Sequence, residues 1–157
     1  MQITARTPNS FEIKAKDGTV LINDHIQIGD FKITDPGEYE VSGIMAEVNN
    51  TVTRLYTEDM TLAVMRSPKT KLSEEQLEEL GALQVLFFPI VSSDFNAKEL
   101  VNLFTQTEAP LIIPMFENKT ILDAFCLSVP SCERQAGALK ITKSQLPEEG
   151  SRIIVFE

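Results

Sequence analysis

The residues best suited to chemistry in this 157-residue chain are a single histidine and a few serines. His25 follows Asp24, so an imidazole and a carboxylate could serve together as a general base or as ligands of a weakly bound metal ion. Ser67, or Ser92 with Ser93, could act as a nucleophile that this base activates. No Gly-x-Ser-x-Gly turn surrounds these serines, and a lone histidine at a turn or strand edge is the simpler interpretation.

The two cysteines offer a second kind of chemistry. Cys126 and Cys132 lie six positions apart, which matches neither a Cys-x-x-Cys redox pair nor a zinc knuckle. We therefore predict two reduced, partly buried thiols, with a disulfide or a reactive thiol as the alternative. The first five residues carry no basic region followed by an apolar stretch, so we expect no signal peptide and a cytoplasmic protein.

Length and composition predict one domain over residues 1–157. An apolar fraction of 43% and a charged fraction of 24% are ordinary for a globular protein. The longest apolar runs, at 85–91 and 110–116, are far shorter than the ~20 residues of a membrane-spanning helix. The formal net charge of −9 repels phosphate backbones and anionic lipid, so we expect neither a nucleic-acid partner nor a membrane partner.

The first 65 residues predict a series of short strands. Apolar and polar residues alternate there with a period of roughly two, which is typical of β-strands. Turn signals at Asp17-Gly18 and Gly29-Asp30 predict two hairpins, and Asp35-Pro36-Gly37 predicts a tight turn. We expect one longer strand from Tyr39 to Met45, and further strands over 52–56 and 62–65.

From Ser73 onward, helices and strands alternate. Capping boxes at Ser73 with Gln76 and at Asn96 with Glu99 predict two helices, the first of which ends at Gly81. The apolar segments 85–88 and 111–115 predict buried strands, a third helix is expected over 120–127, and strands over 139–142 and 153–156. The second helix is expected to turn Leu100, Val101, Leu103 and Phe104 inward. A β-meander followed by strand–helix alternation is a mixed α/β domain in layers.

Six segments, in order along the chain, resemble one known family. They are residues 1–4 (MQIT), 35–41 (DPGEYEV), 71–81 (KLSEEQLEELG), 97–102 (AKELVN), 112–115 (IIPM) and 139–149 (LKITKSQLPEE). In this order they resemble the metallo-β-lactamase-fold hydrolases, in the branch similar to ascorbate-6-phosphate lactonase. The resemblance covers nearly the whole chain and implies a reduced metallo-β-lactamase-like αββα sandwich.

The resemblance also implies a one- or two-metal site at the strand ends, held by several histidines and an aspartate. The family's His-x-His-x-Asp-His loop has no counterpart here, because the chain passes almost directly from residues 21–23 to residues 31–36. Compared with the family, this chain is therefore expected to lack both the metal-binding loop and the helix that follows it. At the remaining positions that match the family's site, this chain has Pro8, Val64, Ser67 and Phe116. Phe116 is expected to fill the former cavity with an apolar ring.

We therefore expect a non-catalytic protein that acts through binding or assembly, with no metal and no cofactor. One alternative is an enzyme or small-molecule binder that reuses a remnant pocket formed by Asn9, Asn23, His25 and Ser92. Another is a metal site rebuilt from Asp24, His25 and nearby acids. Deletion of the loop helix would uncover an apolar sheet face, so we expect a homo-oligomer, most simply a symmetric dimer, or association with a related active subunit.

Overall fold

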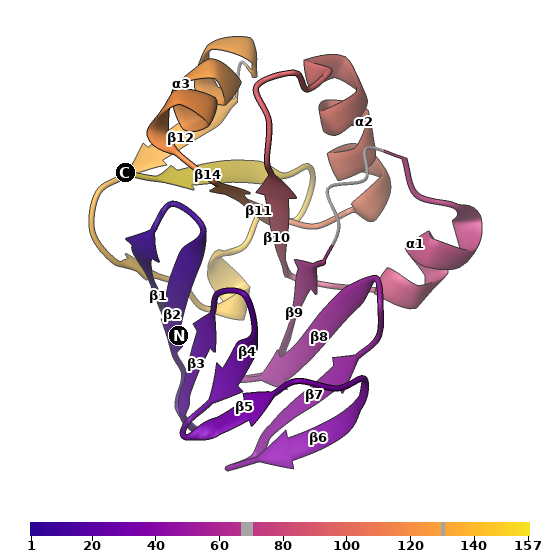
Figure 1. The fold of residues 1–157 in the computed structure, drawn as a ribbon, viewed down its shortest axis with the longest axis vertical. Helices are drawn as coiled ribbons and strands as arrows, with labels where there is room; N and C mark the ends of the chain where they lie inside the picture. Colours follow the sequence, from indigo (N-terminus) through magenta and orange to yellow (C-terminus); the bar gives the residue numbers. More distant parts are fainter. Residues whose placement is uncertain (67–70, 130) are drawn as a thin grey trace.

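The computed structural model describes residues 1–66, 71–129 and 131–157, and shows two packed β-sheets with a layer of helices (Figure 1). The strands are β1 (Gln2–Thr7), β2 (Ser10–Lys14), β3 (Thr19–Ile22), β4 (Ile26–Ile28), β5 (Phe31–Ile33), β6 (Gly37–Val41), β7 (Ile44–Val48), β8 (Val52–Thr57), β9 (Met60–Met65), β10 (Val85–Ile90), β11 (Leu111–Phe116), β12 (Cys132–Gln135), β13 (Leu139–Lys140) and β14 (Arg152–Phe156). The helices are α1 (Glu74–Leu80), α2 (Ala97–Thr107), α3 (Lys119–Ser128) and the short 3-10 helix η1 (Lys143–Gln145).

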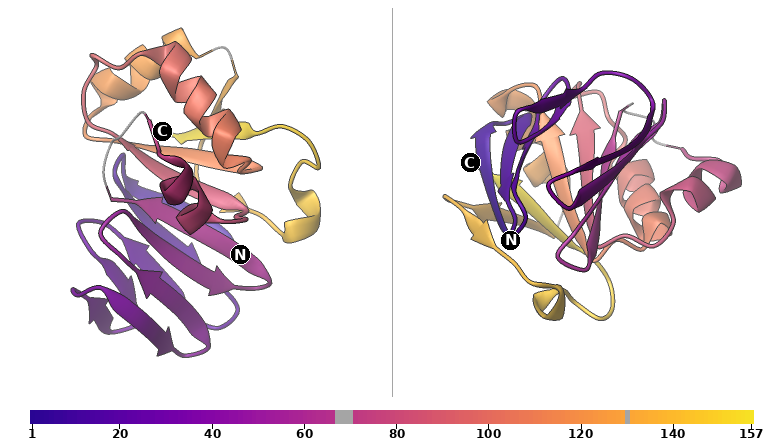
Figure 2. Two further views of the ribbon diagram at one scale, coloured as in Figure 1. Left: turned by 90° about the vertical axis from the view of Figure 1, so that its right-hand side faces the viewer. Right: turned by 90° about the horizontal axis from the view of Figure 1, so that it is seen from below.

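The two sheets differ in size and in strand direction. The six-stranded sheet has the order β13-β1-β2-β3-β4-β5, and its paired strands are antiparallel. The eight-stranded sheet has the order β12-β14-β11-β10-β9-β8-β7-β6; its pairs from β9 to β12 are parallel, and those from β6 to β9 are antiparallel. Helices α1, α2 and α3 pack on the outer face of the eight-stranded sheet, and none of these three covers the six-stranded sheet (Figure 2).

The six-stranded sheet follows the predicted alternation strictly. Its inner face contributes buried side chains to the core between the sheets, namely Ile3, Phe11, Ile13, Val20, Ile22, Ile26, Ile28 and Ile33. Its outer face carries polar residues in register, as in the row Thr4–Glu12–Leu21–Gln27–Lys32, where only Leu21 is apolar. The described residues of this face therefore offer no apolar patch of the kind expected from the deleted helix.

The eight-stranded sheet is buried on both faces where its strands are parallel. Along β11 all six residues are buried, and alternate side chains belong to different cores. Ile113 and Met115 face the other sheet, whereas Ile112 and Phe116 face the helices. The continuous apolar runs predicted as buried strands are thus confirmed, because each run supplies two cores at once.

The predicted helices agree with the structure in position, but two details differ: the capping of α2 and the direction of one of its side chains. Ser73 and Gln76 form the full capping box of α1, whereas Asn96 caps α2 by accepting the backbone N–H of Glu99 at 3.1 Å. Val101, expected to point inward, is 40% exposed, since the buried stripe of α2 runs through Leu100, Leu103, Phe104 and Thr107.

Three other local predictions need correction. The single strand expected from Tyr39 to Met45 is two strands, because Ser42 and Gly43 adopt positive φ values of 54° and 86° and turn the chain back. Strand β12 was not predicted. Cys126 at the end of α3 and Cys132 at the start of β12 form a disulfide with a Cα–Cα distance of 5.5 Å, so the expectation of two reduced thiols is wrong.

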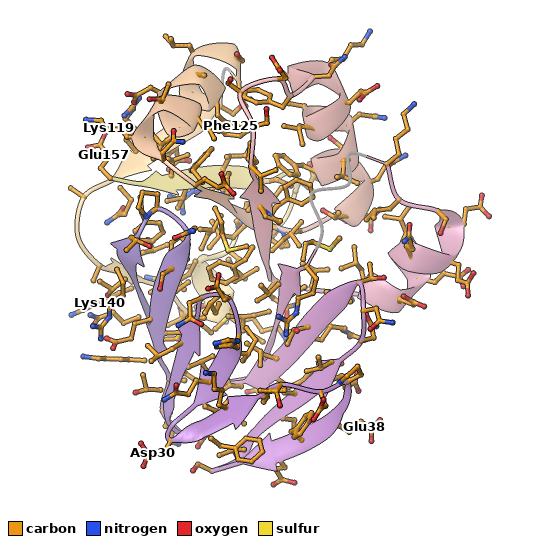
Figure 3. All side chains as sticks on the ribbon, viewed as in Figure 1. Asp30, Glu38, Lys119, Phe125, Lys140 and Glu157 are labelled. Carbon is orange, nitrogen blue, oxygen red and sulfur yellow. A yellow bond between two sulfur atoms is a disulfide. The ribbon has the colours of Figure 1, made fainter. Side chains whose placement is uncertain are left out.

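Strand β6 forms one free edge of the eight-stranded sheet. Its Glu38 and Glu40 are exposed, and Figure 3 shows Glu38 pointing into solvent. None of the helices in the described part of the chain is long and apolar enough to span a bilayer.

Candidate functional site

Two of the four positions matched to the family's metal site meet at one end of the sandwich. Pro8 lies in the turn between β1 and β2, and Phe116 ends β11. The backbone N–H of Phe116 donates to the carbonyl oxygen of Pro8 at 2.9 Å, which ties the two sheets together there. Neither side chain carries a group that binds a metal ion.

Val64 and Phe116 project from opposite faces of the eight-stranded sheet. Val64 is 4% exposed and lies in the core between the sheets. Phe116 is 1% exposed and packs on Phe125 of α3, with ring centroids 5.4 Å apart. Figure 3 shows Phe125 between α3 and the strands. The Phe116 ring therefore fills space beneath the helices and not a cavity between the strand ends. Ser67 lies outside the described residues.

The side chains at these positions do not fit a zinc centre. A catalytic zinc ion needs three converging nitrogen, sulfur or carboxylate ligands and one open position. Across residues 1–66, 71–129 and 131–157, no group of three or more His, Cys, Asp or Glu side chains could hold a metal ion. The donor set of the described chain thus differs from that of metal-dependent hydrolases.

A polar cleft of about 300 Å³ opens beside these strand ends. It is formed by the turn between β3 and β4, the connection from β5 to β6, the turn between β7 and β8, and the end of β9. Its lining consists of Asp24, His25, Ile33, Thr34, Asp35, Pro36, Val48, Asn49, Asn50 and Arg66. It brings together residues from both sheets, and most of its lining groups can form hydrogen bonds or ion pairs.

Arg66 is the cationic group of this cleft. Its backbone N–H donates to the carbonyl of Thr51 at 2.9 Å, and its side-chain Nε donates to Oγ1 of the buried Thr53 at 3.1 Å. Partial burial of the guanidinium lowers the pKa of Arg66 from its usual range. No carboxylate lies within ion-pairing distance of Arg66 in the described chain.

The acidic wall of the cleft consists of Asp24 and Asp35, which come from the six-stranded sheet and its connection to β6. Asp24 precedes His25 in the turn between β3 and β4, where Asn23 Oδ1 accepts the backbone N–H of His25 at 3.0 Å. Asp35 is held through its backbone, because the hydroxyl of Tyr39 donates to its carbonyl oxygen at 2.6 Å. The cleft therefore has walls of opposite charge.

The structure divides the predicted remnant pocket between separate places. His25 lines the polar cleft, and Asn23 shapes the turn that carries it. Asn9 lies in the turn between β1 and β2 and accepts the Thr7 hydroxyl at 2.7 Å. Ser92 lines a different cavity, of about 130 Å³, next to Phe88 and Phe95. Ser92 and His25 thus line different cavities.

Sequence reasoning did not select Arg66, Asn49 or Asn50 and treated Asp35 only as a turn residue. A weak signal was present, since Arg66 is a charged residue directly after the apolar strand β9. Polar residues that end buried strands are frequent members of binding sites. No sequence pattern connects Arg66 to residues 24–36, which only the fold brings near.

One solved structure identifies the fold. A protein from Thermotoga maritima, described as a proposed Zn-dependent hydrolase of the metallo-β-lactamase superfamily, matches 99% of this chain and 98% of its own chain. The TM-score is 0.76 and the sequence identity is 23%. Neither the protein-family models nor the curated proteins gave a match. The chain thus has a metallo-β-lactamase-like α/β fold, as predicted.

Proposed function

We propose that this chain is a non-catalytic relative of the metallo-β-lactamase-fold hydrolases and that it acts by binding a small polar ligand. On this proposal it descends from the branch that resembles ascorbate-6-phosphate lactonase and has lost the metal centre. The supporting observation is that Val64 and Phe116, at two positions matched to the family's metal site, are buried in two different hydrophobic cores. Side chains in these places stabilise the fold and cannot activate water.

The polar cleft favours binding of a ligand over self-assembly as the main role. It offers a guanidinium, an imidazole, two carboxylates and two amides to one space. The polar outer face of the six-stranded sheet gives no reason for a second copy to cover it. A homodimer, or a complex with a related active subunit, remains a prediction that the polar outer face of this sheet does not support.

Metal content and hydrolysis together test the proposal. The protein is purified without chelator, incubated with zinc or manganese, freed of loose ions, and analysed for bound metal by mass spectrometry. Hydrolysis of a lactone, a β-lactam and a thioester is then measured with and without a chelator. We expect substoichiometric metal and no chelator-sensitive turnover. One tightly bound ion per chain together with turnover that a chelator abolishes would overturn the proposal.

A further inference from the structure

We infer that the polar cleft binds a small zwitterion, a molecule with a carboxylate or similar oxyanion at one end and an ammonium group at the other. This inference rests on the proposed binding function and names its ligand class. The oxyanion would contact Arg66, and the ammonium group would contact Asp24 and Asp35. The observations that carry it are the presence of both kinds of charge within one cleft and the absence of ion-pair partners for them among the residues that the structure describes.

Arg66 has donors to spare. A guanidinium has five N–H donors in a planar fork that suits an oxyanion. Only the Nε donor is used in the described chain, by Thr53 Oγ1 at 3.1 Å, and this bond fixes the plane of the group. Residues 67–70 and 130 include no Asp or Glu, so every acidic side chain belongs to the described part. Arg66 therefore has no carboxylate partner within the chain.

Asn49 strengthens the wall that carries Arg66. Its Oδ1 accepts the backbone N–H groups of Thr51 and Val52, both at 2.8 Å. These two bonds use the oxygen of the amide, so the Asn49 NH₂ group is left to donate. Because Thr51 also accepts the Arg66 backbone N–H, Asn49 and Arg66 are held by the same turn. Both groups present N–H donors, which is what an oxyanion requires.

The acidic wall has no ion-pair partner among the residues that the structure describes. Neither Asp24 nor Asp35 forms an ion pair in the described chain, and the Asp35 carboxylate has only a long contact of 3.5 Å from the Thr34 hydroxyl. These two acids come from the β3–β4 turn and the β5–β6 connection, whereas Arg66 and Asn49 come from the eight-stranded sheet. The two kinds of charge thus face the same space from different elements.

A ligand with both charges matches this space better than a ligand with one. A simple anion would meet two carboxylates, and a simple cation would meet a guanidinium, so each would gain from one wall and lose to the other. A zwitterion gains from both. The volume of about 300 Å³ suits a small molecule, since ligand pockets commonly begin at about this size.

A series of ω-amino acids measures the separation of the walls. Glycine, β-alanine, 4-aminobutyrate and 6-aminohexanoate are titrated into the wild-type protein by calorimetry and by NMR of the Arg66 Nε–H signal. For each length, the matched carboxylate and the matched amine serve as controls with a single charge. We expect one length to bind saturably and at least about tenfold more tightly than both of its controls. Equal binding of the zwitterion and either control, or no saturable binding by any member, would overturn the inference.

Variants assign the two ends. Arg66→Gln should weaken binding of the zwitterion about tenfold or more without weakening binding of the amine, because the amine no longer meets the guanidinium. Asp35→Asn should likewise weaken binding of the zwitterion without weakening binding of the carboxylate. Arg66→Lys keeps the charge but loses the planar fork of donors, so its affinity for the zwitterion should lie between those of the wild type and Arg66→Gln. Arg134→Gln, which changes an arginine of β12 paired with Asp123 and Glu157, is the matched control. Unchanged zwitterion affinity in a folded Arg66→Gln protein would also overturn the inference.

The outcome is independent of the metal test. Failure of every zwitterion in a protein without tightly bound metal would reject the ligand class and leave the non-catalytic role in place. Chelator-sensitive hydrolysis would reject the non-catalytic role whatever the calorimetry shows.

Discussion

The two sheets bury their apolar surface in different ways. The six-stranded sheet alternates and directs each isoleucine or phenylalanine to one side, so its other side is polar and stable in water. The parallel part of the eight-stranded sheet is apolar on both sides and depends on α2 and α3 for cover. The comparison shows that the absence of a helix exposes apolar surface only where the uncovered sheet face is itself apolar. In this chain the six-stranded sheet needs no covering helix, because its outer face is polar.

The largest effect is expected where the two sheets meet. Phe87 is fully buried, and its ring centroid lies 5.3 Å from that of Phe11 on the opposite sheet. Phe87→Ala should lower the free energy of unfolding by about 3–5 kcal/mol, through lost transfer energy and a cavity. Urea denaturation measures it. A loss below about 1 kcal/mol would mean that the sheets do not share this core.

Pairs of neighbouring residues test the comparison directly. In β11, Ile112→Ala and Ile113→Ala should each destabilise by about 2–5 kcal/mol, because both faces are buried. In β1, Ile3→Ala should have an effect of the same size, whereas Thr4→Ala on the outer face should stay below about 1 kcal/mol. Comparable losses at Ile3 and Thr4 in chemical denaturation would break the distinction between the sheets.

Much of the fold was predictable because local patterns and tertiary packing agree. The hairpins at Asp17-Gly18 and Gly29-Asp30, the caps at Ser73 and Asn96, and the buried runs all reflect short-range physics. Strand β12 was missed because it is short and polar, with no buried residue. Its pairing with β14 is a long-range contact that local patterns do not encode.

The candidate site was predictable only in part. His25, proposed from the sequence as part of a remnant pocket, lines the polar cleft, whereas Ser92 lines another cavity and Asn9 lies in the turn between β1 and β2. Arg66 was missed because a single charged residue after a strand has no distinctive spacing. The disulfide was missed for a related reason: α3 and β12 approach each other through packing, and a separation of six residues does not reveal it.

A smaller effect is expected from the helical layer that covers the eight-stranded sheet. Asn118 caps α3 by accepting the backbone N–H of Ile121 at 3.0 Å. Asn118→Ala should destabilise by about 1 kcal/mol, because an orphaned N–H loses its partner, whereas Asn118→Asp should retain most of the stability. Thermal unfolding of both variants provides the measurement. Equal losses in the two would show that the cap is not the cause.

The smallest effect concerns the polar face of the six-stranded sheet. The side-chain hydrogen bond from Arg6, with help from the charge of Lys14, lowers the pKa of Glu12 below its ordinary range. The folded-state pKa is thus below the unfolded value, so the contribution to stability is present above about pH 4.3 and is lost as the pH falls through the folded pKa. Carbon NMR titration of the Glu12 carboxyl should show the lowered value, and Arg6→Gln should raise it. A titration that Arg6→Gln leaves unchanged would contradict this origin.

The free edge at β6 has a consequence for the behaviour of this protein at high concentration. An unpaired edge strand can pair with the same strand of another molecule and join the two sheets edge to edge. Pairing of two β6 strands would bring Glu38 and Glu40 of each copy against those of the other, and their repulsion opposes it. The acidic side chains thus oppose edge-to-edge pairing of two copies at this end of the sheet.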